Sequence, residues 1–172
     1  MKIFKNLIVP IMLVFLAVGC SDYLDVEPTD THQIEESVYF QSEADYQAAV
    51  IGTYDPIQWM YLNVLIGDIA SDNSLCGGES ATDVIGLQQI DDMTHFANND
   101  NLFSIWKWCY EGVNRANYLE ENKAKLDFDG KSALYGEVYF LRAYYYFELV
   151  KFFGDVPLIV DRRLDASDSG TI

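Results

Sequence analysis

An all-α fold is predicted from two features of the sequence. The first is the stretch Lys131–Ile159, which has the pattern of one long helix followed by a stop at Gly154 and Pro157. Its apolar residues recur at steps of three and four, the spacing that places side chains on one helical face. The second feature is Leu102–Asn122, which has the same period directly before it. Two helices joined by the short connection 123–130 are expected to pack antiparallel, as a helical hairpin.

The earliest expected helix begins at Ser42, a residue that favours the N-cap position. Glu43 and Asp45 stabilise the start of a helix electrostatically. Pro56 then interrupts the period, and it either kinks the helix or begins a second helix capped by Asp55. The apolar face of this element comprises Tyr46, Ala49, Val50, Thr53, Tyr54 and Ile57.

Residues 67–101 lose this periodicity and are rich in Gly, Asp, Asn and Ser. Loops of this length are usually functional or disordered, so a binding surface is expected here. We predict no metal site, because the acidic residues lack the Asp-x-Asp-x-Asp-Gly spacing of a calcium loop. His95 has no Cys or second His nearby, which favours a solvated loop residue over a metal ligand. The acidic residues concerned are Asp72, Asp83, Asp91, Asp92 and Asp100.

The expected helix Leu102–Asn122 is amphipathic. Glu111 and Arg115 are four residues apart in the order that favours an ion pair. Its polar face also carries Lys107 and Asn114. The face expected to be buried comprises Leu102, Ile105, Cys109, Val113, Ala116 and Leu119.

The helix within Lys131–Ile159 is apolar around nearly its whole circumference, so we expect it to be buried among neighbours. Glu137, Glu148 and Lys151 fall within one narrow polar strip. Arg142 projects away from that strip, into the apolar arc, where a guanidinium needs a carboxylate or carbonyl partner. We therefore expect Arg142 to be a structural anchor between helices, with a ligand contact as the alternative.

Residues 1–20 have the layout of an export signal. A basic start with Lys2 and Lys5 precedes an apolar run, and small residues precede Cys20. This end resembles the lipobox of bacterial lipoproteins, in which the cysteine is lipidated and becomes the mature N-terminus. We thus expect a signal peptide at 1–19, lipidation of Cys20 and a polar tether over 20–41. An ordinary secretory signal with a chance cysteine is the alternative.

The chain has a formal net charge of −16, which argues against nucleic acid as a partner. Its twelve tyrosines and three tryptophans suit both packed helix interfaces and sugar-stacking surfaces, and composition does not separate the two uses. Cys76 and Cys109 remain beyond the lipidation site. Either a disulfide between them or two free thiols is compatible with the sequence.

Two segments carry a resemblance to a known family. They are WKWCYEGVNRANYLEEN, from Trp106, and YGEVYFLRAYYYFELVKFFGDVPLI, from Tyr135. Together with the lipidation signal and the helix near Ser42, they resemble the N-terminal region of the SusD/RagB family. The resemblance implies tetratricopeptide-like helical hairpins with long irregular loops. Because family members are much longer, residues 42–172 are expected to be an incomplete N-terminal helical region.

The same resemblance implies a lipid-anchored protein of the outer membrane that faces the cell exterior. Family members bind oligosaccharides or other nutrients and deliver them to a TonB-dependent, SusC-like transporter, without catalysis and without a cofactor. From their location alone, the ligand-binding candidates are Trp59, Tyr61, Asn73 and His95. Trp106 and Trp108 lie at helix spacing and are expected to be packing residues.

Two other functions compete with this one. A helical repeat scaffold that binds only a protein partner is suggested by the excess of apolar helix surface. A glycoside hydrolase is suggested only by the abundance of carboxylates. Two catalytic carboxylates must flank the sugar, and adjacent Asp91 and Asp92 give no sign of that arrangement. No phosphate loop, nucleophile elbow or metal-binding helix motif is present, so we predict a protein that is not an enzyme.

Overall fold

The computed structural model describes residues 38–71, 73–80, 82–165 and 168. The predicted signal peptide, Cys20, most of the tether and Asp72 lie outside the described residues. The chain divides into two compact units, residues 1–39 and 40–172. All helices among the described residues belong to the second unit.

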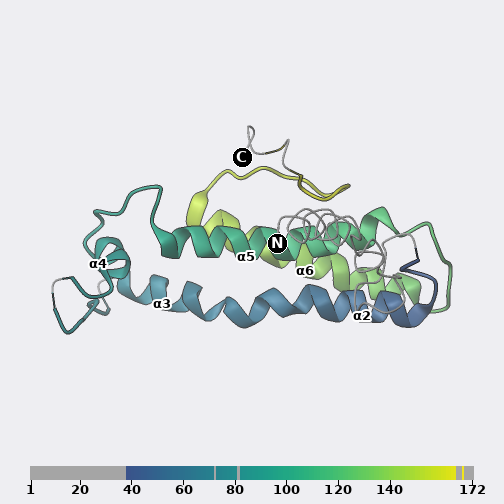
Figure 1. Cartoon of the computed structure of the whole chain (residues 1–172), viewed down its shortest axis with the longest axis horizontal. Coiled ribbons are helices and arrows are strands. Elements are labelled where there is room, and N and C mark those ends of the chain that lie inside the picture. The colour runs from purple at the N-terminus through teal and green to yellow at the C-terminus, as the bar shows by residue number, and fades with distance from the viewer. Residues whose placement is uncertain (1–37, 72, 81, 166–167, 169–172) are drawn as a thin grey trace, which may run out of the picture. The chain divides into compact units, whose positions relative to one another are not determined.

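The described part of the second unit is helical and contains no strand, which confirms the all-α prediction (Figure 1). None of its helices is long and apolar enough to span a membrane. The elements are α2 (Glu43–Tyr54), the 3₁₀-helix η2 (Asp55–Trp59), α3 (Tyr61–Ile69), α4 (Ile85–Asp91), α5 (Asp100–Glu121) and α6 (Lys131–Phe153).

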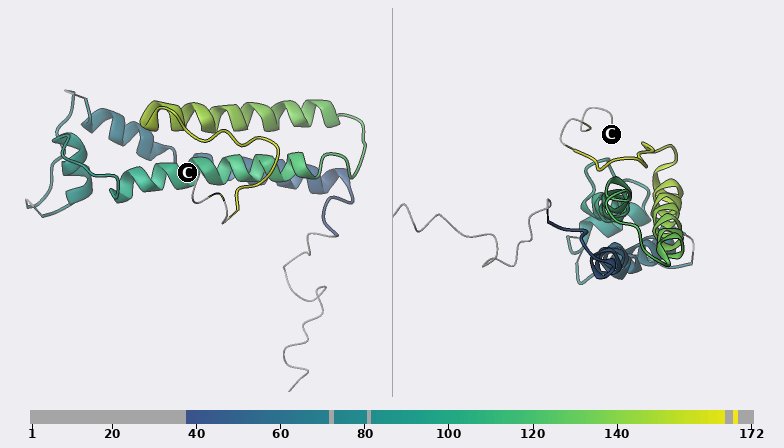
Figure 2. Two further views of the ribbon diagram at one scale, coloured as in Figure 1. Left: turned by 90° about the horizontal axis from the view of Figure 1, so that it is seen from above. Right: turned by 90° about the vertical axis from the view of Figure 1, so that its right-hand side faces the viewer.

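The predicted hairpin is present, since α5 and α6 run antiparallel side by side (Figure 2). Helix α2 packs against both of them. A Cβ atom on Gly112 would lie 2.3 Å from the ring of Tyr145, so glycine is needed where α5 approaches α6. The predicted buried face of α5 is confirmed except at Leu102, which is half-buried. It meets α6 in a core that includes Ile105, Cys109, Val113, Leu141, Tyr145 and Leu149.

Helix α2 begins as predicted, with Ser42 as its N-cap. The backbone N–H of Ser42 donates to Asp45 Oδ2 at 2.8 Å, and the Ser42 hydroxyl accepts from Asp45 N at 3.4 Å. Hydrogen bonds from Ser42 lower the pKa of the Asp45 carboxyl. Pro56 begins a second helix, as one of the two expectations had it: it lies in the first turn of η2, where its missing N–H is tolerated. The expected cap is wrong, because Tyr54 holds the N-cap position. Asp55 forms an ion pair with Arg115 instead of a cap, with 2.9 Å between Oδ2 and Nη1.

The segment 67–101 is more ordered than its sequence predicts. Helix α3 continues to Ile69, α5 begins at Asp100, and the seven residues of α4 lie between them. Helix α4 is too short to show a periodic pattern. It is fixed by tertiary contact, because Ile90 is buried in the main core.

Helix α6 ends at Gly154 as predicted, with φ at 70° and the Gly154 N–H donating to Val150 O at 3.0 Å. The expectation that neighbours surround this helix is wrong on one side, because α5 and α2 cover only part of it. Phe140 and Phe147 are 69% and 62% exposed. Glu148, expected in the polar strip, is buried and accepts a hydrogen bond from Asn63 Nδ2 at 2.6 Å.

Candidate functional site

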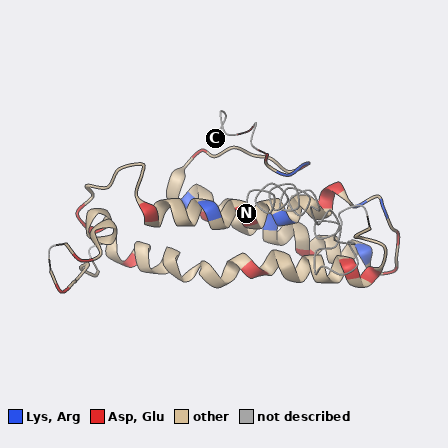
Figure 3. Ribbon diagram, in the orientation of Figure 1, with Lys and Arg blue, Asp and Glu red and all other residues tan. Residues whose placement is uncertain are grey.

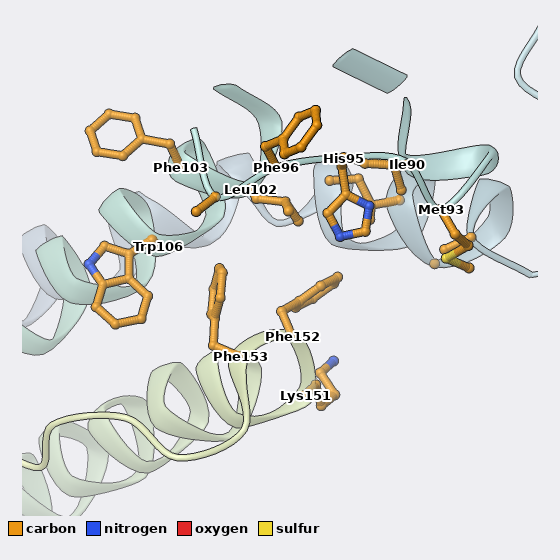
Figure 4. Close-up of a pocket in the computed structure, with 14 residues that line it drawn as sticks. Ile90, Met93, His95, Phe96, Leu102, Phe103, Trp106, Lys151, Phe152 and Phe153 are labelled. Atoms are coloured by element: carbon orange, nitrogen blue, oxygen red, sulfur yellow. The ribbon is translucent and has the colours of Figure 1, made fainter. Parts of the chain in front are cut away.

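An open cavity of about 1000 Å³ lies between the end of α3, the start of α5 and the last turn of α6 (Figure 4). The loop that follows α4 forms its fourth side. Most of its lining is apolar, and its polar side chains are His95 and Lys151. The lining residues are Ile66, Gly67, Ala70, Ile90, Met93, His95, Phe96, Ala97, Leu102, Phe103, Trp106, Lys151, Phe152 and Phe153.

Hydrogen bonds at the start of α5 hold the cavity wall in place. Asn99 is the N-cap of α5, and its Oδ1 accepts from the backbone N–H groups of Asn101 at 3.0 Å and Leu102 at 3.3 Å. The Asn99 Nδ2 group donates to Gly86 O at 2.9 Å, which ties α4 to α5. After α4, Met93 takes a positive φ of 54°, and the Thr94 N–H donates to Gln89 O at 2.8 Å. This turn carries the chain directly to His95 and Phe96, which line the cavity.

Aromatic rings dominate the cavity wall. Trp106 contacts Phe153 edge to face, with 5.0 Å between ring centroids and 84° between planes. Trp106 is also 4.8 Å from Tyr110 between ring centroids, so its position is fixed from two sides. Phe96 and Phe103 are 70% and 61% exposed at the rim. The cavity therefore offers several flat apolar surfaces, two of which are open to solvent.

The charge of Lys151 is largely balanced within the protein. Its Nζ lies 2.6 Å from Glu148 Oε2, and the Glu148 carboxylate is buried. Asn63 supports the pair from α3, although its own Oδ1 is buried without a hydrogen-bond partner among the described residues. Such a lining suits a neutral ligand better than a charged one.

Cys76 and Cys109 are free thiols in the structure, which resolves the alternative that the sequence left open. Cys109 is fully buried beside the Glu148–Lys151 pair. Burial, with a smaller contribution from Glu148, raises the pKa of the Cys109 thiol to about 12. Because the thiolate is the nucleophile, this cysteine packs in the core and does not react.

The four candidate ligand residues do not form one site. His95 lines the cavity. Trp59 stacks on Trp108 at the contact between η2 and α5, and Tyr61 is 60% exposed on α3. Asn73 is exposed in the loop after α3, where its N–H donates to Ser71 Oγ at 3.3 Å.

Arg142 lies between α6, α5 and the C-terminal segment. Its Nη1 donates to Asn117 Oδ1 at 3.0 Å and to Val160 O at 2.6 Å. The guanidinium also lies over the Tyr139 ring, 5.2 Å from its centroid. Both partners are oxygens of the protein itself, one on α5 and one in the segment after α6. We therefore propose that Arg142 is a structural anchor that holds these parts of the chain together.

Half of the cavity lining comes from residues 67–101, where a binding surface was predicted, and the part contributed by α5 and α6 was not predicted. Phe152 and Phe153 continue apolar rows that the pattern assigns to the core, and Trp106 was expected only to pack. The sequence does indicate that these two phenylalanines lie in the last turn of the helix, before Gly154. A side chain at the end of a helix can extend beyond the helices that pack beside it and so line a cavity.

The chain resembles known proteins along most of its length. A family model described as "Starch-binding associating with outer membrane" matches residues 22–170. The chain belongs to the SusD-like family. The predicted resemblance is thereby confirmed, together with the helical hairpin class that it implies.

Three curated proteins of Formosa agariphila are similar to this SusD-like chain. SusD-like protein P2 is 29% identical over 174 aligned positions, which cover 94% of this chain and 32% of the relative. SusD-like protein P25 is 25% identical, with 100% of this chain and 36% of the relative covered. SusD-like protein P38 is 28% identical, with 98% and 33% covered. The chain thus spans about a third of the length of these relatives. No solved structure gives a significant match.

Proposed function

We propose that this SusD-like chain is part of a cell-surface lipoprotein that captures oligosaccharides and delivers them to a TonB-dependent outer-membrane transporter. The observation that carries the proposal is the match of residues 22–170 to a family described as starch-binding and associated with the outer membrane. The aromatic cavity supports it, since exposed Phe96 and Phe103 provide surfaces on which sugar rings can stack.

The charges of the described surface fit an uncharged ligand. Lys and Arg are few, and acidic residues are distributed over several helices and loops (Figure 3). An acidic surface repels polyanions but has little effect on neutral glycans. A neutral oligosaccharide is therefore the ligand class that we propose.

Attachment to the membrane is proposed to occur through Cys20, which lies outside the described residues. Three acyl chains on a mature N-terminal cysteine hold a protein effectively permanently at a bilayer. A Cys20→Ser chain expressed in the native host is expected to leave the membrane fraction. Retention of that variant in the outer membrane would contradict the anchor.

Glycan arrays and calorimetry on the purified chain test the capture step. Replacing both exposed rim residues, Phe96 and Phe103, by Ala is expected to weaken oligosaccharide binding by about tenfold through loss of two aromatic contacts. Phe140→Ala is the matched control, because Phe140 is equally exposed but lies on α6 away from the cavity lining. No glycan binding by the unaltered chain would refute the proposal.

Isolation of the lipoprotein from outer membranes should also recover a TonB-dependent transporter.

The protein is proposed to act without catalysis. The buried Cys109 thiol is held in its neutral form, and the buried Glu148 carboxylate is engaged by Lys151 and Asn63. Incubation of the chain with the bound oligosaccharide should return it at unchanged length. Measured cleavage that survives further purification would instead favour the hydrolase.

A scaffold that binds only a protein partner is the second candidate. The observation in its favour is the exposed apolar side of α6, where Phe140, Phe147 and Val150 are more than half exposed. This function predicts recovery of the transporter without any saccharide binding, so calorimetric detection of saccharide would count against it.

A further inference from the structure

Two stacked indole rings lie at the contact between η2 and α5, away from the cavity. The rings of Trp59 and Trp108 are 5.3 Å apart between centroids, and their planes are inclined by 24°. Trp106, which lines the cavity, and Trp108 are two residues apart, about 200° around the axis of α5. The stacked pair and the cavity therefore lie on opposite sides of that helix.

Trp59 is both fixed and exposed. One face of its ring is covered by Trp108, yet 41% of the residue is accessible to solvent. The pair therefore presents an indole at the surface that is held on one side by a second indole. An indole already held by a neighbour loses little freedom when a ligand stacks on it, which lowers the entropic cost of binding.

A network of polar side chains continues along the same contact. Arg115 donates through Nη1 to Asp55 Oδ2 at 2.9 Å and to Gly52 O at 2.5 Å, and through Nη2 to Glu111 Oε1 at 2.5 Å. Asp55 Oδ1 also accepts from Gln58 Nε2 at 2.8 Å. The side chains of Arg115, Asp55 and Glu111 are 34%, 50% and 41% exposed. The network is therefore prearranged at the surface, and its members keep donors and acceptors to spare.

The indole pair and the polar network both join η2 to α5 and follow one another along the same contact. Trp59 lies against Trp108, and Asp55 lies against Arg115, so the two elements meet at both points. Trp108 and Arg115 are separated by about 10 Å along α5, the length of a short oligosaccharide. A flat apolar ring beside fixed donors and acceptors matches a pyranose, which has apolar C–H faces and a rim of hydroxyl groups.

We propose that the Trp59–Trp108 pair and the Asp55–Arg115–Glu111 network form a second saccharide-binding site. A sugar ring stacks on Trp59, and the hydroxyl groups of the adjoining sugar bond to the network. One guanidinium and two carboxylates leave this site with a net negative charge, so it selects neutral sugars over anionic ones. The inference rests on the proposed function for the class of ligand, but the site is separate from the cavity.

The Trp59→Leu variant tests this site, because leucine keeps an apolar side chain over Trp108 and removes the flat ring. Calorimetry of the purified full chain uses maltoheptaose, laminarihexaose and xylohexaose. For the oligosaccharide that the unaltered chain binds, Trp59→Leu is expected to reduce affinity by about threefold, because it removes one aromatic contact where the change at Phe96 and Phe103 removes two. Glu111→Gln, which keeps the side-chain shape, is expected to weaken binding without disturbing the indole pair.

Fluorescence provides a readout that is specific to this side of α5. The sequence contains three tryptophans, so a Trp106→Phe chain retains only the stacked pair. Saturating oligosaccharide is expected to shift its emission to shorter wavelength and to protect it from acrylamide quenching. Addition of Trp59→Leu to this chain should abolish the shift.

Three outcomes would overturn the site. Unchanged affinity in a folded Trp59→Leu chain, while the Phe96 and Phe103 variants lose binding, would refute this inference and leave the proposed function intact. No saccharide binding by the unaltered chain would contradict both. Loss of transporter recovery by Trp59→Leu with saccharide affinity intact would show that the indole pair is a protein contact.

Discussion

Gly112 lies on α5 opposite the ring of Tyr145, where a Cβ atom would come within 2.3 Å of that ring. Tyr145 is fully buried, and its hydroxyl donates to Thr53 O in α2 at 2.6 Å. That hydrogen bond fixes the far end of the ring, so the ring cannot move away from a larger residue at 112. The absence of one Cβ on α5 therefore allows a tyrosine of α6 to reach across to α2.

Gly112→Ala is expected to lower the free energy of unfolding by about 1–3 kcal/mol, the usual cost of overpacking a core. The gain in helix propensity, about 1 kcal/mol, does not compensate. Gly136→Ala is the matched control, since a Cβ there meets nothing within 4 Å and should stabilise α6. Urea unfolding of both variants measures the difference, and equal effects of the two would contradict the role assigned to Gly112.

At the scale of elements, the segment after α6 turns back along the α5–α6 hairpin (Figure 2). Asn117 of α5 is fully buried, and its Nδ2 donates to Ile159 O at 2.9 Å and to Arg162 O at 2.8 Å. Arg142 of α6 completes the arrangement by donating to both Asn117 Oδ1 and Val160 O. One buried amide thus joins two helices to an extended segment.

Asn117→Ala is expected to cost about 2–3 kcal/mol of unfolding free energy, because three hydrogen bonds of a fully buried side chain are lost, although Ile159 O keeps the hydrogen bond from the Tyr146 hydroxyl at 2.8 Å. Asn114→Ala removes a single hydrogen bond, from Leu164 N at 2.8 Å, and should cost about 1 kcal/mol. Hydrogen exchange should show faster exchange over residues 155–165 in the Asn117 variant. Unaltered exchange there would mean that other contacts hold the segment.

The long helices could be predicted from sequence because each buries one face, and burial produces the three-four period. Leu141 and Leu149 follow that period and are buried. Helix α4 could not be predicted in this way, since its one buried residue, Ile90, depends on contact with distant elements. The pairing of Asp55 with Arg115 likewise joins residues that only the tertiary fold brings together.

The sequence predicts a binding surface within residues 67–101, and half of the cavity lining comes from that segment, but His95 is the one ligand candidate of the sequence that lies in the lining. Its wall takes residues from four segments, and the last turn of α6 is one of them. Periodicity reports which side chains share a face, but it does not report where the neighbouring helix ends. For the same reason the sequence predicts Trp59 as a ligand residue without indicating that Trp108 supports it.

At the scale of the whole molecule, α6 presents one apolar row that no other element among the described residues covers. Phe140, Phe147 and Val150 are 69%, 62% and 52% exposed. With Gly136 and Ala143 they recur at steps of four, three, four and three residues, the period of a helix that packs against another helix. A patch of this kind on a protein surface marks an interaction surface.

The purified chain is therefore expected to self-associate as its concentration rises. The double variant Phe140→Glu, Phe147→Glu should stay monomeric, because association would bury two carboxylates. Ile51→Glu is the control, since Ile51 is 71% exposed on α2 but lies outside the row. Sedimentation velocity over a wide concentration range measures the effect. If the double variant and the control associate equally, the row is not the surface responsible. Saccharide affinity is then measured on Phe140→Glu alone, because Lys151 of the cavity lies over the Phe147 ring, 5.3 Å from its centroid. A capture protein is expected to keep its affinity in this variant, since Phe140 belongs neither to the cavity lining nor to the indole pair.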